Sequence, residues 1–127
     1  MIPSTVMQCC VLESVMVSKE LIAASTRPLV LGVLSKGESY GYEIIREIRT
    51  RSDGQLEWSE GMLYPVLHRM EKEKLIVSSW KIGDNGRKRK YYRLSASGKR
   101  SMAAERKQWL TVHNTLGTLW GAKTCSS

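Results

Sequence analysis

The stretch of sequence that decides the fold runs from residue 59 to 94 and reads SEGMLYPVLHRMEKEKLIVSSWKIGDNGRKRKYYRL. Ser59 stands where a helix N-cap is expected, and the residues through Lys74 repeat apolar side chains at the spacing of one buried helix face. These apolar residues are Leu63, Val66, Leu67 and Met70. Strand-like stretches follow at 75–81 and 89–94, separated by the turn-forming residues GDNG at 83–86. The stretch therefore predicts a helix followed by a β-hairpin.

Two more helices are expected before this stretch. The first covers 18–35, where Pro28 either kinks the helix or opens a new one, and where the run LVLGVL at 29–34 also fits a short buried strand. Ser39 is expected to cap the second, from Tyr40 to Arg51. Pro65 predicts a kink or an irregular first turn in the third helix.

A long helix is expected after the hairpin, capped by Ser95 and ending near Trp120. The order helix, helix, helix, hairpin, helix predicts a mostly α (α+β) fold, a winged helix-turn-helix with a C-terminal dimerisation helix. The expected organisation is a flexible extension at 1–17, a DNA-binding domain at 18–94, the dimerisation helix at 95–120 and a flexible tail at 121–127.

Composition limits the class of protein. The 127 residues suffice for one hydrophobic core, and 42% of them are hydrophobic. No apolar run is long enough to span a bilayer, and the first twenty residues do not resemble a secretory signal, so a cytoplasmic protein is expected. Cys9, Cys10 and Cys125 lack zinc-site spacing, which predicts free thiols, no metal and no cofactor. The net charge of +8 favours a polyanionic partner.

The third helix and the hairpin carry the predicted contacts with double-stranded DNA. The helix face opposite its apolar stripe presents Glu60, Tyr64, His68 and Lys72 at intervals of four. A helix fits the major groove, and Tyr64 and His68 could reach base edges or phosphates there. The run RKRK at 87–90 beside a glycine-containing turn is typical of a wing that contacts the minor groove or the backbone. Arg87 and Arg89 are the expected contacts at its tip.

The last helix carries an apolar seam. Met102, Trp109 and Leu116 lie seven residues apart, Val112 and Leu119 lie three beyond the last two, and Trp120 follows. Glu105 interrupts this seam. Because exposed tryptophans on a lone helix would leave large apolar surfaces in water, we expect these six residues to form a homodimer interface. Packing on their own domain is the alternative for some of them.

Three motifs in this order resemble the PadR family of bacterial transcriptional regulators. They are GYEI at 41–44, LYP at 63–65 and RKYYRL at 89–94, and the resemblance covers about residues 19–120. It implies that both the LVLGVL run and the LYP segment are helical. It also implies a DNA-binding surface, and the full set of expected contact residues is Tyr42, Ser59, Tyr64, His68, Lys72, Arg87, Lys88 and Arg89. The lead-in Glu60–Met62 departs from the small or proline-rich residues common in that family.

The resemblance extends to the short members of the family with one C-terminal helix, which dimerise through it. Among them is a lactococcal regulator that binds several drugs between paired tryptophans. Trp109 falls at the matching place, so a small hydrophobic or aromatic effector is expected there. The function expected on this basis is repression from a palindromic operator, released by that ligand.

Two other classes of protein are alternatives to a regulator. The sequence lacks the G-x-S-x-G, phosphate-loop and H-E-x-x-H motifs, so an enzyme is not expected. A non-specific RNA-binding module that uses the same basic hairpin stays open, because Tyr91 and Tyr92 could stack on bases. No membrane partner is expected.

Overall fold

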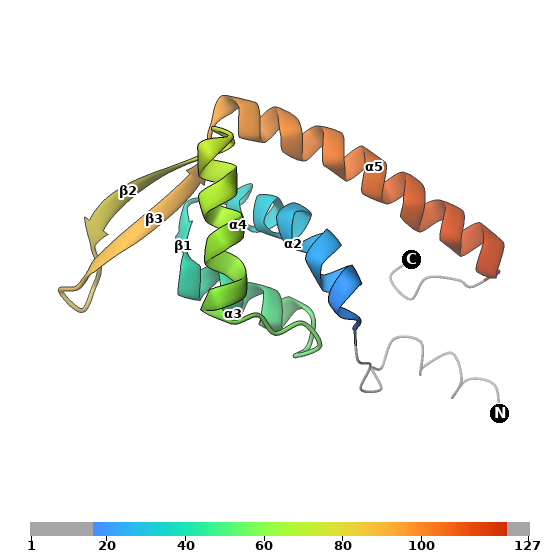
Figure 1. Cartoon of the computed structure of the whole chain (residues 1–127), viewed down its shortest axis with the longest axis horizontal. Coiled ribbons are helices and arrows are strands. Elements are labelled where there is room, and N and C mark those ends of the chain that lie inside the picture. The colour runs from blue at the N-terminus through green and yellow to red at the C-terminus, as the bar shows by residue number, and fades with distance from the viewer. Residues whose placement is uncertain (1–16, 122–127) are drawn as a thin grey trace.

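The computed structural model describes residues 17–121, which form four helices and a three-stranded antiparallel sheet (Figure 1). The elements in chain order are α2 (Lys19–Leu34), β1 (Ser39–Tyr40), α3 (Gly41–Arg51), α4 (Glu60–Lys72), β2 (Ile76–Ile82), β3 (Lys88–Leu94) and α5 (Ala96–Trp120). The strands are ordered β1-β3-β2, so β3 is central and β2 is an edge. This is the predicted winged helix-turn-helix with one long helix after the wing.

Helix α2 runs without interruption through Pro28. The Ser18 hydroxyl accepts a hydrogen bond from the Leu21 amide at 3.1 Å and caps the helix. Val30, Leu31 and Leu34 from the LVLGVL run are buried in the core. The run is therefore helical, and neither a strand nor a second helix starts there.

The predicted start of the second helix was wrong. Ser39 does not cap it, because Ser39 and Tyr40 form β1 and pair with Tyr92 and Tyr91 of β3. The Ser39 hydroxyl instead donates to the Glu43 carboxylate at 2.7 Å. Tyr40 is the N-cap residue and makes no side-chain cap bond. The predicted two-stranded hairpin is thus part of a three-stranded sheet.

Helix α4 begins as predicted, since the Ser59 hydroxyl accepts from the Met62 amide at 3.3 Å. It continues through Pro65 and ends at Lys72, two residues earlier than expected, and Lys74 has a left-handed φ of 64°. The wing then turns through Gly83–Arg87, where Gly86 has a φ of 79° that glycine adopts at no steric cost. The two wing strands pair in continuous register from Ile76↔Leu94 to Ile82↔Lys88.

One hydrophobic core joins the helices to the base of the sheet. It comprises Val30, Leu31, Leu34, Ile44, Ile45, Ile48, Trp58, Leu63, Leu67, Met70, Ile76, Tyr92 and Leu94. Helix α5 starts against this core, where the Ser95 hydroxyl accepts from the Gly98 amide at 3.0 Å. A Cβ on Gly98 would lie 1.9 Å from the carbonyl oxygen of Leu75, so this glycine lets α5 approach the base of the wing.

The two ends of the chain were expected to be a flexible extension and a flexible tail. Residues 1–16 and 122–127, with Cys9, Cys10 and Cys125, lie outside the described residues, so the extension and tail expected there stay predictions. Between residues 17 and 121 no helix is both long and apolar enough to cross a membrane. The same part of the chain contains no group of three or more His, Cys, Asp or Glu that could hold a metal ion.

Candidate nucleic-acid interface

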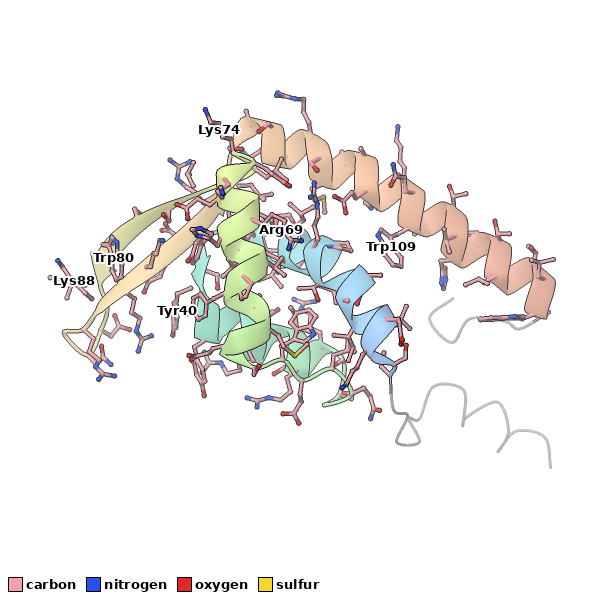
Figure 2. The ribbon with its side chains drawn as sticks, viewed as in Figure 1. Tyr40, Arg69, Lys74, Trp80, Lys88 and Trp109 are labelled. Atoms are coloured by element: carbon pink, nitrogen blue, oxygen red, sulfur yellow. The ribbon has the colours of Figure 1, made fainter. Side chains whose placement is uncertain are left out.

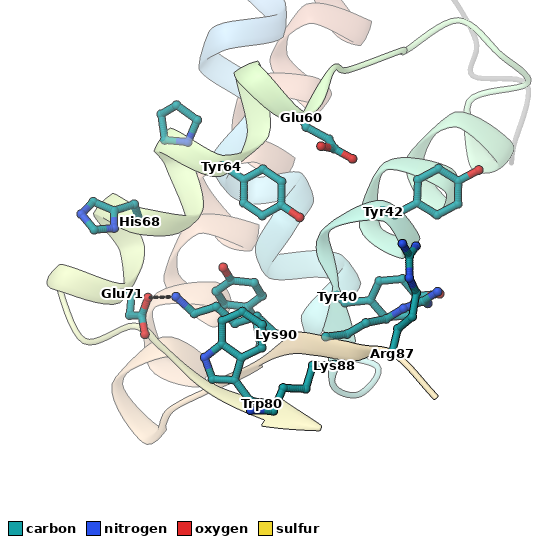
Figure 3. Close-up of a pocket in the computed structure, with 13 residues that line it drawn as sticks. Tyr40, Tyr42, Glu60, Tyr64, His68, Glu71, Trp80, Arg87, Lys88 and Lys90 are labelled. Carbon is teal, nitrogen blue, oxygen red and sulfur yellow. Dashed lines mark ion pairs between the residues drawn. The ribbon is translucent and has the colours of Figure 1, made fainter. Parts of the chain in front are cut away.

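A groove of about 860 Å³ separates α4 from the wing (Figure 3). It is open to solvent, and aromatic and charged side chains line it from β1, α3, α4, β2, β3 and the turn before β3. The lining residues are Tyr40, Tyr42, Glu60, Tyr64, Pro65, His68, Glu71, Trp80, Arg87, Lys88, Arg89, Lys90 and Tyr92. Six of the eight residues predicted to contact DNA lie in this set.

The other two predicted contact residues lie outside the groove. Ser59 and Lys72 are exposed at opposite ends of α4, and the Ser59 hydroxyl is engaged in capping the helix. Tyr64 and His68 stand one helical turn apart between these ends, both exposed on the face away from the core. The helix face expected to read DNA is therefore exposed, and it lines the groove from Glu60 to Glu71.

Tyr64 is held in place by α3. Its ring lies directly against Gly41, where a Cβ would fall 2.4 Å from the phenol oxygen and 2.7 Å from the carbon that carries it. Burial raises the pKa of the Tyr64 phenol, and the Glu60 carboxylate raises it further. The phenol therefore stays protonated at neutral pH and can donate a hydrogen bond to a phosphate or base acceptor.

The positive charges of the wing divide between its two faces. Arg87 and Lys88 are exposed at the tip, whereas the guanidinium of Arg89 lies over the Tyr40 ring, 4.4 Å from its centroid. Arg89 is thus half-buried on the face that carries Tyr40 and Tyr91. Of the two residues expected to contact DNA at the tip of the wing, Arg87 is the more exposed, because Arg89 packs on Tyr40.

Glu71 of α4 ties the wing to the helix. Its carboxylate accepts a hydrogen bond from the Ser78 hydroxyl at 2.5 Å and forms an ion pair with the Lys90 ammonium at 3.5 Å. Ser78 lies on β2 and Lys90 on β3, so one α4 side chain holds both wing strands. Burial, followed by the charge of Glu71, raises the pKa of the neighbouring Tyr92 phenol to about 12.

The groove residues that sequence reasoning missed include Tyr40, Trp80 and Lys90. Lys90 belongs to the basic run, and alternation along β3 places it on the side facing α4, which is a signal that the sequence does contain. Trp80 is 63% exposed, and the same alternation along β2 could have identified it. No pattern in the sequence indicates that Tyr40 lines the groove, because its position depends on the pairing of β1 with β3.

The structure weakens the base-stacking argument for RNA. Tyr92 is buried, as expected for one of two adjacent strand residues. Tyr91 packs edge-on against Tyr40 with ring centroids 5.3 Å apart, and the Lys81 ammonium lies 5.5 Å from its ring centroid. Both tyrosine rings thus have partners within the chain.

The apolar seam of α5 divides into two parts. Met102 packs on the core of its own chain, and Glu105 accepts from Arg27 of α2 at 2.8 Å. The later seam residues have large exposed fractions: Trp109 37%, Val112 51%, Leu116 36%, Leu119 76% and Trp120 72%. Of the six predicted dimer contacts, Met102 therefore has a partner in its own domain, and five remain available.

Trp109 lies on the side of α5 that faces α2 (Figure 2). It borders an apolar cavity of about 610 Å³, together with Leu21, Leu29 and Leu56. The predicted ligand-binding residue is therefore part of a concave apolar surface and does not project alone into solvent.

The fold and groove define a winged-helix DNA-binding protein, in which an exposed helix face and a basic wing border one concave surface. The sequence matches the Transcriptional regulator PadR-like family over residues 30–104, and the chain belongs to this family. It is a transcriptional regulator, which confirms the predicted class, and the family membership supports the prediction that it is not an enzyme.

Individual relatives agree with this assignment. The chain is 33% identical over 97 residues to an uncharacterised protein X from Lysinibacillus sphaericus, covering 76% of this chain and 89% of that protein. It is 30% identical over 89 residues to the transcriptional regulator Rv3488 of Mycobacterium tuberculosis, covering 70% and 79%. The crystal structure of a PadR-like transcriptional regulator from Bacillus cereus superposes with a TM-score of 0.73 at 30% identity, covering 83% of this chain and all of that one.

Proposed function

We propose that this regulator is a cytoplasmic homodimer that binds a palindromic operator in double-stranded DNA and represses transcription. The observation that carries the proposal is the shared groove, in which Tyr64 and His68 of α4 face the same space as Arg87 and Lys88 of the wing. Two independent elements thus present donors and cations to one elongated ligand.

In this proposal α4 enters the major groove, which is about 12 Å wide and admits a helix of about 10–12 Å. Tyr64 and His68 approach base edges or phosphates, and Lys72 reaches a phosphate at the end of the helix. Glu60 would be repelled by phosphates, but it can accept a hydrogen bond from a cytosine amine. Arg87 and Lys88 contact the backbone beside the adjacent minor groove.

The exposed end of α5 supports a homodimer. Burying one tryptophan side chain removes about 150–250 Å² from water, which corresponds to roughly 4–6 kcal/mol as an upper bound. Trp120, 72% exposed, offers most of such a surface on the seam face of α5, and Trp109, 37% exposed, offers the smaller part that its own chain leaves uncovered. A second copy packed through its own α5 would cover this face on both chains by the same contacts.

The link between α5 and α4 favours a defined spacing of the two DNA-binding surfaces. Arg27 donates to Glu105 of α5 at 2.8 Å and to Glu73, which follows α4, at 2.9 Å. The Ser95 hydroxyl at the start of α5 also donates to the carbonyl of Lys74 at 2.7 Å. A dimer through α5 would therefore place two α4 helices in a fixed relation, as a palindromic site requires.

The cavity beside Trp109 supports a small aromatic effector. A flat apolar molecule could stack on the indole and cover Leu21, Leu29 and Leu56 at the same time. Binding there would disturb α5 and so release DNA. The test is a titration with hydrophobic dyes: Trp109→Phe should lose the quenching of tryptophan emission, and unchanged emission and DNA affinity in the wild-type protein would contradict the effector.

Selection of bound duplexes from a random DNA pool at about 0.15 M salt tests DNA recognition. We expect an enriched palindrome whose half-sites are about one helical turn apart. Tyr64→Phe with His68→Ala should enrich no such sequence, while Asn114→Ala on α5 serves as the matched surface control. Retention that depends on salt but selects no sequence would contradict the proposal and favour non-specific nucleic-acid binding.

A further inference from the structure

The edge strand of the wing carries two large apolar side chains in water. Trp80 is 63% exposed and Ile82 is 72% exposed. Residues two apart on a strand share a face, so Ser78, Trp80 and Ile82 point to the same side of the sheet. The Ser78 hydroxyl bonds to Glu71, which shows that this side faces α4. Trp80 accordingly borders the groove in Figure 3.

Each of these apolar residues stands beside a lysine. The strand register pairs Trp80 with Lys90 and Ile82 with Lys88, and Arg87 follows at the tip. Lys88 and Arg87 are exposed. The face of the wing toward α4 is therefore an apolar strip on β2 next to a cationic strip on β3.

This arrangement is unusual for a sheet edge that stays in water. Natural edge strands are commonly protected from association by charged residues or proline. On β2 the charged residue, Lys81, lies on the opposite face beside Tyr91, so the face toward α4 presents a tryptophan and an isoleucine near the free end of the strand. Among the described residues no other element pairs with the outer edge of β2. A partner that covers Trp80 and Ile82 would remove their apolar surface from water.

We propose that Trp80 and Ile82 are DNA-contacting residues that pack against deoxyribose and base edges in the minor groove, while Lys88 and Arg87 hold the flanking phosphates. The inference rests on the proposed function and extends it from a cationic wing to an apolar one. Charge complementarity selects the partner, because duplex DNA alternates anionic phosphates with apolar sugar surfaces along each strand. Proteins that bind the minor groove commonly place apolar side chains against base steps.

The indole N–H of Trp80 is also a hydrogen-bond donor. The minor-groove edge of an A·T pair presents only acceptors, whereas a G·C pair adds a donor amine that would oppose the indole N–H. The wing of this protein therefore prefers A·T pairs at the position next to Trp80.

The first test compares variants for affinity to the duplex recovered by selection, measured by fluorescence anisotropy over a range of salt concentrations. Trp80→Ala should weaken binding about tenfold without changing the salt slope, because no phosphate contact is lost. Lys88→Ala should weaken binding and reduce the slope by about one unit. Ser79→Ala, on the opposite face of the same strand, should match the wild type.

Two outcomes of this test have different meanings. If wild-type protein selects and binds a duplex but Trp80→Ala binds it equally well, the inference about Trp80 is wrong and the proposed function stands. If the wild-type protein binds no duplex with sequence preference, the proposed function itself fails.

A second test follows the indole directly. Subtracting the emission of a Trp80→Phe variant from that of the wild-type protein leaves the emission of Trp80, and this variant keeps the core Trp58 and the tryptophans of the proposed α5 interface unchanged. Saturating the selected duplex should shift and quench this emission, and replacing A·T by G·C at the wing position should weaken the response. Trp80 emission that does not change when DNA is added would overturn the inference. If that emission changes with protein concentration instead, the apolar strip of Trp80 and Ile82 is a protein–protein contact.

Discussion

The phenol of Tyr64 lies against the backbone of Gly41, so close that a Cβ at residue 41 would fall 2.4 Å from the phenol oxygen. These two residues belong to the GYEI and LYP motifs, which are more than twenty positions apart in the sequence. The contact explains the need for glycine at the start of α3, since any larger residue would displace the ring that borders the DNA groove.

Gly41→Ala should therefore lower DNA affinity more than stability. The added methyl meets the far end of the partly exposed Tyr64 side chain, so the ring can turn away. The free energy of unfolding should fall by less than the roughly 1–3 kcal/mol of an overpacked core, while DNA affinity falls because the phenol is displaced. Chemical denaturation and anisotropy titration measure the two effects. Gly32→Ala, in the middle of α2 with nothing within 4 Å of the added methyl, should be neutral or stabilising. Equal behaviour of the two variants would contradict the role of the Gly41–Tyr64 contact.

The Tyr92 phenol should make stability depend on pH in the alkaline range. Burial and Glu71 raise its pKa to about 12, above the value near 10 of an unfolded tyrosine. The unfolded chain therefore loses this proton first, so stability is complete below pH 10 and falls as the pH rises from about 10 to 12. Tyr92→Phe removes the titrating group and should show a smaller loss in denaturation experiments over this range. Parallel curves for the two proteins would contradict the assignment.

Arg27 should stabilise the contact among α2, α4 and α5. Its guanidinium bonds to Glu73 and Glu105, but it is partly exposed, so Arg27→Ala should cost about 1 kcal/mol or less. Arg49→Ala, which removes a longer 3.8 Å ion pair with the exposed Glu57, should cost less. A double-mutant cycle with Glu105→Gln measures the coupling, which should shrink at high salt. Additive effects of the two substitutions would show that the Arg27–Glu105 ion pair does not contribute to stability.

Leu116→Glu should separate the proposed dimer. It places a charge within the exposed seam of α5, and sedimentation velocity should show a shift from dimer toward monomer at a fixed protein concentration. Asn114→Glu is the matched control, because a residue two positions away lies on nearly the opposite side of a helix. A wild-type protein that sediments as a monomer, or two variants that sediment alike, would contradict the α5 interface.

The elements that sequence could predict are those coded by neighbouring residues. The Ser59 cap, the apolar stripe of α4 and the turn at Gly86 are local signals, and the structure confirms each of them. The strand at Ser39–Tyr40 was missed because its partners, Tyr91 and Tyr92, lie some fifty residues later. A hydroxyl before a helix predicts a cap equally well whether or not a distant strand occupies that residue.

The candidate site shows the same division. Periodicity found Tyr64 and His68, since the buried side of a helix also defines its exposed side. The interruption of the α5 seam at Glu105 had no local explanation, because its reason is Arg27 on another helix. Likewise, no sequence pattern reveals that Arg89 is drawn toward Tyr40 while Arg87 remains free.

Hydroxyl-radical footprinting of the selected duplex tests the central claim most directly. Two DNA-binding surfaces joined through α5 should protect two equivalent patches, about one helical turn apart and related by the twofold axis of the palindrome. Each patch should include a protected minor-groove segment that becomes accessible when Arg87 and Lys88 are both replaced by alanine. A single patch, or weak protection spread evenly along the duplex, would contradict a dimeric, sequence-specific regulator.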